Sequence, residues 1–396
     1  MSVSETIKAI DASITSLTSN PGALLEPERQ QLLAAAKRLQ NAVESPVDTI
    51  VSITLGTHRG AAVRVAMDMV LFTALLGAEE GGITAKGLGE KTDGDPLLIT
   101  RLMRFLIPLG FAKELDVDLY VPTPKTGFFA TGSPLQASIT HLATHSQILV
   151  KLADYFRETG YKNPTDTFSG PFQYAFNTKV HYWEWLKTDP VQQAAFNAHM
   201  ALTRMDRGQH WYEFFPVEER FGNNSPDTPL LIDIGGGLGH DLAEFHSRFP
   251  NLPGKLILQD LPAAIEDIKD LSSSIERMKY DFFTPQPVKG ARVYYMRTVL
   301  HDWPDKQSLE ILKNIREAMT KDSVLLLNEN FLPEKYVPLF NAEVDLSMMA
   351  MFAAEERTEK QWKVLLEEAG LEVVKVWYPS ERLDASATLF EAVRKD

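Results

Sequence analysis

The chain of 396 residues contains no cysteine, which excludes disulfide frameworks, thiolate zinc sites and cysteine nucleophiles. It also lacks a long uninterrupted apolar run. The most apolar region, residues 61–78, is interrupted by Arg64 and Asp68, and the start of the chain does not resemble a signal peptide. We therefore expect a cytoplasmic protein that neither crosses a membrane nor is secreted.

Basic residues are scarce relative to acids: 40 Lys and Arg against 53 Asp and Glu give a formal net charge of −13. Phosphate contacts need clustered basic side chains, so this balance argues against a nonspecific hold on nucleic acid. Apolar residues make up 44% of the chain, enough to bury substantial cores. The length favours two domains over one.

Two apolar stripes with helical spacing lie within the first 45 or so residues. Helices that precede any compact domain need a partner to cover such faces. Packing on their own chain and docking against a second subunit both meet this need. The stripes consist of Ile7, Ile10, Ile14 and Leu17 in the first helix, and of Leu32, Leu33, Ala36, Leu39 and Val43 in the second.

The region that follows has the order helix, short helix, helix and hairpin, which is typical of a winged helix-turn-helix. The first helix is expected over 61–76 and the short one over 83–90. The third helix begins after its cap Asp95 and ends at Gly110. Two strands are expected within 111–121.

DNA binding is the obvious function for such a unit, but its charges argue against it. The candidate recognition helix is mostly apolar, and the wing carries Glu114, Asp116 and Asp118. Acidic side chains repel phosphate. We therefore expect this winged-helix-like unit to serve in dimerisation or as a lid over the substrate.

Residues 131–225 are predicted to be helical and are rich in aromatic, histidine and methionine side chains. Each of these side chains could belong to a core, but together they suit the wall of a pocket for a flat apolar ligand. A polar, turn-rich linker at 223–227 precedes the last domain. The expected domains are therefore 1–130, 131–225 and 226–396.

The last domain alternates strands with helices, the pattern of a mostly parallel, doubly wound, Rossmann-like sheet. Because the last two strands are close in sequence, one antiparallel edge strand is expected. The predicted fold class is α/β, with an all-helical, winged-helix-like N-terminal domain. The seven strands are expected at 230–234, 255–260, 277–281, 293–297, 323–328, 372–378 and 388–393.

The first of these strands continues into the cluster Gly235, Gly236 and Gly237, which opens into a helical segment. In this geometry glycines let a ligand approach the backbone while a helix N-terminus faces its charge. A dinucleotide fingerprint G-x-G-x-x-G would need a small residue where His240 stands. The loop therefore predicts a nucleoside-containing cofactor other than a dinucleotide.

Two acids follow the next two predicted strands. Asp260 ends one strand, and a carboxylate at that place can hold a ribose. Asp281 ends the other and precedes Phe282, which suits an adenine whose amine is accepted by the carboxylate while a ring packs on its face. The pair predicts an adenosine across the strand ends, although Asp281 alone is also compatible with a strand-end turn.

The motifs of the chain, in order, are Asp233-Ile-Gly-Gly-Gly-Leu-Gly239, Gln259-Asp-Leu-Pro262, Asp281-Phe282, His301-Asp-Trp303, Glu329 and Glu356-Arg-Thr358. This ordered set resembles the class I O-methyltransferases of the plant caffeate and fungal polyketide type, over nearly the whole chain. The resemblance implies S-adenosylmethionine as cofactor, with Asp233 and Leu261 among its contacts, and a homodimer whose partner contributes to the pocket. Arg297 stands where the family usually has a lysine near the adenine.

Methyl transfer to a phenol needs a base, because a phenol with a pKa of about 10 is mostly protonated at neutral pH. His301 follows the apolar strand 293–300 and would project at its carboxyl end, and an imidazole near its own pKa at pH 7 can take the proton. The resemblance gives Glu329 and Glu356 the role of flanking His301 and holding its tautomer. Asp302 is expected to hold local backbone or the substrate side of the site.

The acceptor pocket is expected to combine the helical region with the segment 345–352, where the family uses methionines. The candidate substrate contacts, besides Asp302, are Trp303, Met348, Met349, Phe352, Met200, Phe196 and His145. A metal site would need clustered Asp and Asn ligands, and no such set has convincing spacing. We therefore predict metal-independent methylation of a hydroxyl on an aromatic, polyketide or alkaloid secondary metabolite.

Two rival functions stay open. Fungal relatives that resemble these methyltransferases direct dehydration or pericyclic reactions and keep the cofactor as an electrostatic element. Such proteins tend to lose the base histidine, whereas His301, Glu329 and Glu356 are all present here. The second rival is a cofactor-sensing regulator with a DNA-binding winged helix, against which the acidic wing argues.

Overall fold

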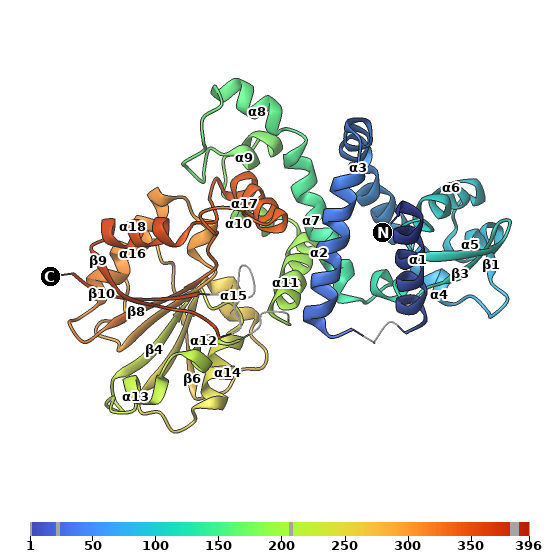
Figure 1. Cartoon of the computed structure of the whole chain (residues 1–396). Coiled ribbons are helices and arrows are strands. Elements are labelled where there is room, and N and C mark those ends of the chain that lie inside the picture. Colours follow the sequence, from blue (N-terminus) through green and yellow to red (C-terminus); the bar gives the residue numbers. More distant parts are fainter. Residues whose placement is uncertain (1, 21–23, 206–208, 381–387, 396) are drawn as a thin grey trace. The chain divides into compact units, whose positions relative to one another are not determined.

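The computed structural model describes residues 2–20, 24–205, 209–380 and 388–395. The chain divides into two compact units, Met1–Thr126 and Gly127–Asp396 (Figure 1). Their boundary lies close to the one expected near residue 130. The expected helical connecting region and the expected sheet domain fall within the same unit.

The first unit is helical apart from a small sheet. Polar side chains cap several of its helices: Ser2 accepts a hydrogen bond from the amide of Glu5, and Asp95 accepts one from the amide of Leu98. The helices are α1 (Val3–Ser19), α2 (Glu26–Val43), α3 (Pro46–Asp68), α4 (Leu71–Leu76), α5 (Ala85–Thr92) and α6 (Pro96–Leu106).

The helix expected over 61–76 is in fact two helices, of which α3 begins much earlier. Ser45 caps α3 in a reciprocal capping box with Asp48, so local side-chain chemistry sets its start. The break before α4 falls at Val70, whose φ is 57°. A β-branched residue rarely adopts this left-handed conformation, so the sequence carries no signal for the break.

A three-stranded antiparallel sheet completes the first unit, in the order β1-β3-β2. The expected hairpin is present as β2 (Ala112–Asp116) and β3 (Leu119–Pro122). The short helix expected over 83–90 is preceded by β1 (Ile83–Thr84), because Ile83 pairs with Tyr120 of β3.

The second unit begins with the predicted helical region. Buried aromatic side chains of α9 and α10 pack with Phe352 of α17 (Leu339–Phe352), which lies much later in the chain. The elements of this region are η1 (Thr126–Phe129) at the boundary, α7 (Pro134–Leu149), α8 (Leu152–Thr159), α9 (Pro171–Phe176), α10 (Tyr182–Leu186), α11 (Pro190–Met205), α12 (Trp211–Phe214) and α13 (Val217–Phe221).

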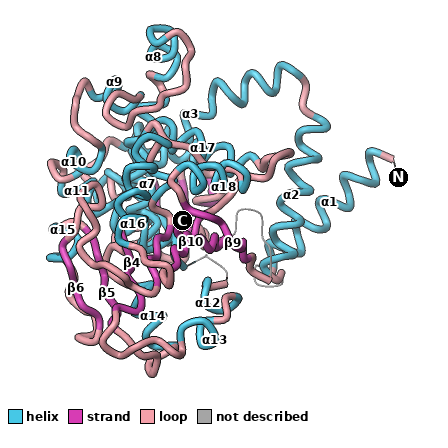
Figure 2. The backbone as a smooth tube through the Cα atoms, turned by 90° about the vertical axis from the view of Figure 1, so that its left-hand side faces the viewer, coloured by secondary structure: helices cyan, strands magenta, loops and turns pink. Residues whose placement is uncertain are grey.

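A seven-stranded sheet with helices on both faces forms the rest of this unit (Figure 2). Successive residues of a strand face opposite cores: in β7, Tyr294 and Met296 join one core cluster, and Val293 and Tyr295 join the other. The strands are β4 (Pro229–Ile234), β5 (Lys255–Asp260), β6 (Ile275–Lys279), β7 (Val293–Arg297), β8 (Val324–Glu329), β9 (Leu371–Trp377) and β10 (Thr388–Arg394).

The helices between the strands are α14 (His240–Arg248), α15 (Pro262–Asp267), α16 (Asp305–Ala318), α17 (Leu339–Phe352) and α18 (Glu359–Glu368), with the short turn η2 (Leu300–Asp302) after β7. The strand order is β6-β5-β4-β7-β8-β10-β9. The chain runs outward from β4 through β5 to β6 and then returns to β7 on the other side of β4. Ligands of open α/β sheets bind at such a reversal, beyond the carboxyl ends of the strands. The fold therefore brings Gly235, after β4, and His301, after β7, to the same edge.

Two details of the sheet differ from expectation. The antiparallel strand β10 is not at the edge but between β8 and β9, and all its residues from Thr388 to Ala392 are buried or nearly so. Strand β6 ends at Lys279 rather than at Asp281, because Asp281 already begins a turn in which its carbonyl oxygen accepts from the amide of Thr284.

None of the helices that the structure describes is long and apolar enough to cross a membrane. Even α3, with 23 residues, carries Asp48, Arg59, Arg64 and Asp68 along its length.

Candidate active site

The glycine loop after β4 is tied to the end of the neighbouring strand β5. The amide of Gly235 donates to the carbonyl oxygen of Gln259 at 2.8 Å, and the amide of Gly237 donates to Oδ2 of Asp260 at 2.8 Å. Gly235, Gly237 and Gly239 have φ angles of 73°, 60° and 77°, a left-handed conformation that glycine adopts without steric cost. The path of this loop therefore depends on glycine.

Gly236 and Gly237 differ in what a side chain would meet. A Cβ on Gly236 would lie 2.5 Å from Cγ of Asp233 and 2.5 Å from Cδ1 of Leu258, both of which belong to buried residues. A Cβ on Gly237 would meet no atom of the described residues within 4 Å. The loop is thus packed against the protein at Gly236 and open at Gly237, where a ligand can approach the backbone.

Asp260 holds the loop through both carboxylate oxygens. Oδ2 accepts from the amide of Gly237, and Oδ1 accepts from the amide of Leu261 at 2.7 Å. Burial raises the pKa of Asp260, although these two hydrogen bonds oppose the shift. Because a carboxylate has about four acceptor sites, Asp260 can also accept hydroxyl groups of a bound ribose.

Asp281 lies in the turn after β6, with Oδ1 accepting from the amide of Phe283 at 3.0 Å. Asp281 therefore takes the strand-end turn position that the sequence left open as an alternative. The same turn brings the ring of Phe282 to the glycine loop, within 3.9 Å of where a Cβ on Gly235 would stand. Phe282 also meets the ring of Trp303 edge to face, with centroids 5.7 Å apart.

Arg297 and Asp281 were expected to serve the same adenine, but the sheet order separates them. Arg297 ends β7, whereas Asp281 follows β6, with β4 and β5 in between. The guanidinium of Arg297 donates to Oδ2 of Asp241, in the first turn of α14, at 2.6 Å. This ion pair is largely buried, with the two side chains 11% and 12% exposed, so Arg297 orders the start of the helix that follows the glycine loop.

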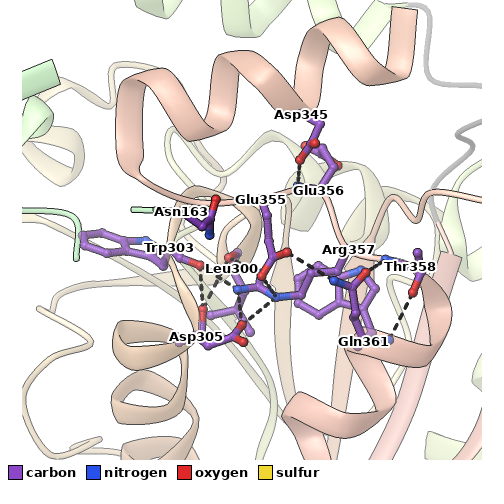
Figure 3. A network of polar contacts seen from close by, with 12 residues as sticks. Asn163, Leu300, Trp303, Asp305, Asp345, Glu355, Glu356, Arg357, Thr358 and Gln361 are labelled. Carbon is purple, nitrogen blue, oxygen red and sulfur yellow. Dashed lines mark hydrogen bonds and ion pairs between the residues drawn. The ribbon is translucent and has the colours of Figure 1, made fainter. Parts of the chain in front are cut away.

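His301 is paired with Glu356, as its predicted role requires. Nδ1 of His301 lies 2.7 Å from Oε1 of Glu356, and Nε2 lies 3.5 Å from Oδ1 of Asp302. The amide of Glu356 donates to Oδ1 of Asp345 on α17 at 2.8 Å (Figure 3). Because Glu356 accepts at Nδ1, a neutral imidazole carries its proton there and leaves the lone pair of Nε2 available.

Glu329 occupies a different place from the one expected for it. Its Oε1 accepts from the amides of Val299 and Leu300, both at 2.9 Å, and makes no hydrogen bond to the imidazole of His301. Its Oε2 is buried without a hydrogen-bond partner among the described residues. Glu329 therefore holds the backbone that carries His301 and acts on the imidazole through its charge.

The carboxylates around His301 control its protonation. Burial lowers the pKa of His301, but the charges of Asp302, Glu356 and Glu329 outweigh burial and raise the pKa to about 10. Burial also raises the pKa of Asp302 to about 6 and that of Glu329 to about 7. An imidazole near its ordinary pKa was expected, whereas these carboxylates raise the pKa of His301 and favour the imidazolium. For His301 to act as a base near pH 7, a further positive charge nearby has to lower the pKa of its imidazole.

A continuous set of rings, here called the aromatic wall, extends from the turn η2 into the helical region. Trp303 stacks on His181 with centroids 4.6 Å apart, and His181 is followed by Phe352, Trp183 and Phe196 at successive centroid distances of 6.2, 5.3 and 5.1 Å. Trp303, Phe352 and Phe196 were predicted site residues. Trp183 was expected only as one of the side chains that together suit the wall of a pocket, and His181 was missed because no local spacing pointed to it.

Three histidines adjoin the end of the aromatic wall. The ring of His141 lies 5.3 Å from that of Phe196 and 5.2 Å from those of His145 and His199. Burial lowers the pKa of His141 to about 3 and that of His145 to about 4, so both are neutral at pH 7. His145 was a predicted contact, whereas His141 and His199 were expected only among the side chains that together suit the wall of a pocket. The i, i+4 spacing of His141 and His145 could have indicated the pair, whereas only the packing of α7 on α11 brings His199 to them.

The predicted methionines lie on two helices of this unit. Met348, on α17, packs against the cluster that contains Phe352, and Met349 beside it is partly buried. Met200, on α11, is 37% exposed. Within the described ranges no three or more His, Asp or Glu side chains are grouped closely enough to hold a metal ion.

Residues 150–372 match the family model of the O-methyltransferase domain. The chain belongs to the O-methyltransferase family. It is 38% identical to O-methyltransferase asqD of Emericella nidulans over 344 aligned residues. The aligned region covers 84% of this chain and 87% of that protein. The solved structure of LepI in complex with SAM is similar with a TM-score of 0.86 at 30% identity over the full length of both chains. A structure described as a pericyclic reaction enzyme is similar with a TM-score of 0.85 at 30% identity, over 99% of this chain and 100% of that one.

The prediction of S-adenosylmethionine as the cofactor of this O-methyltransferase is confirmed by the family and by its S-adenosylmethionine-bound structural relative. The residues of the glycine loop fit such a cofactor. Gly237 leaves the loop open, Asp260 has remaining acceptor sites at the end of β5, and Phe282 places a ring beside the loop. The overall α/β fold predicted from the sequence is confirmed as well.

Proposed function

We propose that this O-methyltransferase methylates a hydroxyl group of an aromatic, polyketide or alkaloid secondary metabolite, with His301 as general base and without a metal ion. The observation that carries the proposal is the 2.7 Å contact between Nδ1 of His301 and Oε1 of Glu356. His301 lies beyond the end of β7, and Val299 of the same segment lies beside Gly235 of the glycine loop. A base oriented in this way, beside a cofactor site, suits proton removal from an acceptor hydroxyl.

In this proposal Nε2 of His301 accepts the proton of the acceptor hydroxyl, while Glu356 holds Nδ1 and stabilises the imidazolium that results. S-adenosylmethionine supplies an electrophilic methyl group on a positively charged sulfur. A positive charge near His301 lowers its pKa, which the surrounding carboxylates raise to about 10. His301 would then release its extra proton to solvent, which leaves Nε2 able to take the proton of the acceptor hydroxyl. Asp302, at 3.5 Å from Nε2, lies on the acceptor side.

Cofactor contacts are proposed for the glycine loop and for the ends of β5 and β6. Asp233, Gly235, Gly236 and Gly237 form the loop and its support. Asp260 with Leu261 would hold the ribose, and Asp281 with Phe282 would hold the adenine. Arg297 contributes through its ion pair with Asp241, which orders the start of α14.

The acceptor is proposed to lie along the aromatic wall, since flat apolar ligands bind where rings line a concave site. Trp303, at one end of the wall, directly follows the turn that carries His301. Met348 and Met349 would clamp the acceptor from α17. Met200 and His145 would contact it from the helical region, where the neutral histidines can donate or accept hydrogen bonds.

The test is incubation with methyl-labelled S-adenosylmethionine and a panel of phenolic polyketides and alkaloids, for the wild type and for His301→Ala. We expect a labelled product from the wild type and a loss of about 100-fold or more in the variant. Turnover should survive treatment with a chelator. If chelation abolished turnover and magnesium restored it, the proposal of a metal-independent histidine base would be wrong.

A pericyclase or dehydratase that keeps S-adenosylmethionine is the second candidate. The similarity to a pericyclic reaction enzyme at a TM-score of 0.85 favours it. The paired His301 and Glu356 favour methyl transfer, because a base has no evident use in a purely pericyclic step. Conversion of an acceptor without incorporation of label would support this second candidate.

We also infer that the chain forms a homodimer through its winged-helix-like first unit, and that this unit does not bind nucleic acid. No side chain of α1 is buried within the described residues, and apolar side chains of α2 and α3 are exposed, among them Val43 at 73% and Ile53 at 74%. Sedimentation should show a dimer that Ile53→Glu weakens. A gel shift at physiological salt should show no DNA binding, since the hairpin carries acidic side chains.

A further inference from the structure

The turn η2, which carries His301, is held by two buried charged side chains. Oε1 of Glu329, at the end of β8, accepts from the amides of Val299 and Leu300, both at 2.9 Å. The carbonyl oxygens of the turn are bound by a second side chain. A short 3-10 turn has few hydrogen bonds of its own, so its position depends on such partners.

Arg357 provides these partners, with a side chain that is only 1% exposed. Its Nη1 donates to the carbonyl oxygen of Leu300 at 3.1 Å, and its Nη2 donates to that of Trp303 at 2.9 Å. These two residues lie on either side of His301. Figure 3 shows the guanidinium reaching both carbonyls and Asp305.

Arg357 makes further contacts besides these two hydrogen bonds. Its Nε and Nη2 donate to Oδ1 of Asp305 at 3.0 and 2.7 Å, and the guanidinium lies over the ring of Trp362 at 4.8 Å from its centroid. A planar guanidinium can donate in several fixed directions at once, whereas the single nitrogen of a lysine cannot reach the same acceptors together. The site therefore requires arginine and not merely a positive charge.

The position of Arg357 in the sequence links these contacts to the imidazole. It directly follows Glu356, whose Oε1 contacts Nδ1 of His301. One short stretch of backbone thus contacts η2 at two points, the imidazole through Glu356 and the carbonyl oxygens through Arg357. If η2 moves relative to this stretch, the contact between His301 and Glu356 has to lengthen.

We propose that Arg357 is a positioning residue for the reaction: together with Glu329, which binds the amides of the same segment, it fixes His301 against Glu356 and keeps Nε2 directed to the acceptor. The consequence for catalysis rests on the proposed function. The orientation of His301 does not rest on it and can be measured without an acceptor.

The experiment compares Arg357→Lys with a matched control, Arg292→Lys. Arg292 also donates to backbone carbonyl oxygens of the second unit, those of Asp322 and Arg220, but it precedes β7 at the other end of that strand. Protein labelled with ¹⁵N-histidine is studied by NMR, and the signal of His301 is assigned by its absence in His301→Gln.

In the wild type and in Arg292→Lys we expect an Nδ1–H signal of His301 that exchanges slowly with solvent, as a charge-assisted bond to a buried carboxylate implies. In Arg357→Lys we expect this signal to broaden or vanish, and the pKa of His301 to fall by about one unit or more as the contact with Glu356 loosens. A folded Arg357→Lys protein with an unchanged His301 signal and pKa would overturn the proposal, because a purely structural role leaves both unchanged.

If Arg357→Lys does not fold, Asp305→Asn decides. This change leaves Arg357 in place but weakens its anchor, and the same spectroscopic change is expected to a smaller extent. An unaltered His301 spectrum in Asp305→Asn would then overturn the proposal.

Kinetics separate this inference from the proposed function. With an acceptor that the wild type methylates, Arg357→Lys should lower kcat about tenfold or more and leave KM for S-adenosylmethionine within about twofold. An equal loss of kcat in Arg292→Lys would contradict the inference. If no acceptor is methylated by the wild type, the proposed function fails while the NMR comparison still tests the orientation of His301.

Discussion

The neighbouring glycines Gly236 and Gly237 allow a sharp test of the cofactor loop, because alanine at each should have opposite consequences. At Gly236 a Cβ would overlap the buried Asp233 and Leu258 at 2.5 Å, closer than real Cβ atoms approach. Relieving this overlap requires the buried side chains of Asp233 and Leu258 to shift. Overpacking of this kind costs about 1–3 kcal/mol, a sizeable part of the stability of an ordinary domain.

At Gly237 the cost to folding should be small and the cost to binding large. Its φ of 60° costs alanine about 1 kcal/mol, and no described atom lies within 4 Å of the new Cβ. The added methyl group instead occupies the open side of the loop. We expect Gly237→Ala to bind the cofactor product S-adenosylhomocysteine at least about tenfold more weakly, equivalent to about 1.4 kcal/mol.

Urea denaturation and calorimetric titration with S-adenosylhomocysteine measure the two effects separately. Gly236→Ala should unfold at markedly lower urea, and Gly237→Ala should unfold close to the wild type but bind poorly. Wild-type affinity in Gly237→Ala would show that the cofactor does not lie against the open side of the loop. Wild-type stability in Gly236→Ala would refute the packing argument.

Three further predictions concern the charged groups. Glu356→Gln removes a carboxylate 2.7 Å from His301, so NMR titration should find the pKa of His301 lowered by about one unit or more from its raised value near 10. Because folding raises the pKa of Glu329 to about 7, its contribution to stability is full below the ordinary pKa of 4.5 and is lost as pH rises through 7. Glu329→Gln, which keeps an acceptor for the two amides, should therefore gain stability relative to the wild type between pH 4.5 and 7, by on the order of 2–3 kcal/mol in urea denaturation; a difference that does not vary with pH would contradict this. A double-mutant cycle on Arg297 and Asp241 should give a coupling of about 1–3 kcal/mol, since the pair is largely buried; additive losses would show that the ion pair is incidental.

Local patterns were sufficient for the elements that position the site. The sequence predicts the apolar runs of β4, β5 and β7 and the glycine turn after β4, because hydrophobic periodicity and turn residues are local properties of the chain. Since the carboxyl ends of parallel strands meet at one edge, the sequence also predicted that His301 and the glycine loop lie close together. The contact between His301 and Glu356 came from the family resemblance, because residues so far apart in sequence share no local pattern.

The sequence by itself thus determined the α/β alternation, the identity of the cofactor loop and the candidate base. Only the tertiary structure decided what surrounds them. It inserted β10 between β8 and β9, paired Arg297 with Asp241, and turned Glu329 to the backbone of η2. These outcomes depend on which distant segments pack together and on burial, which sets both hydrogen-bond partners and pKa values. The carboxylates around His301 raise its pKa against the opposing effect of burial, a property that no spacing of residues could reveal.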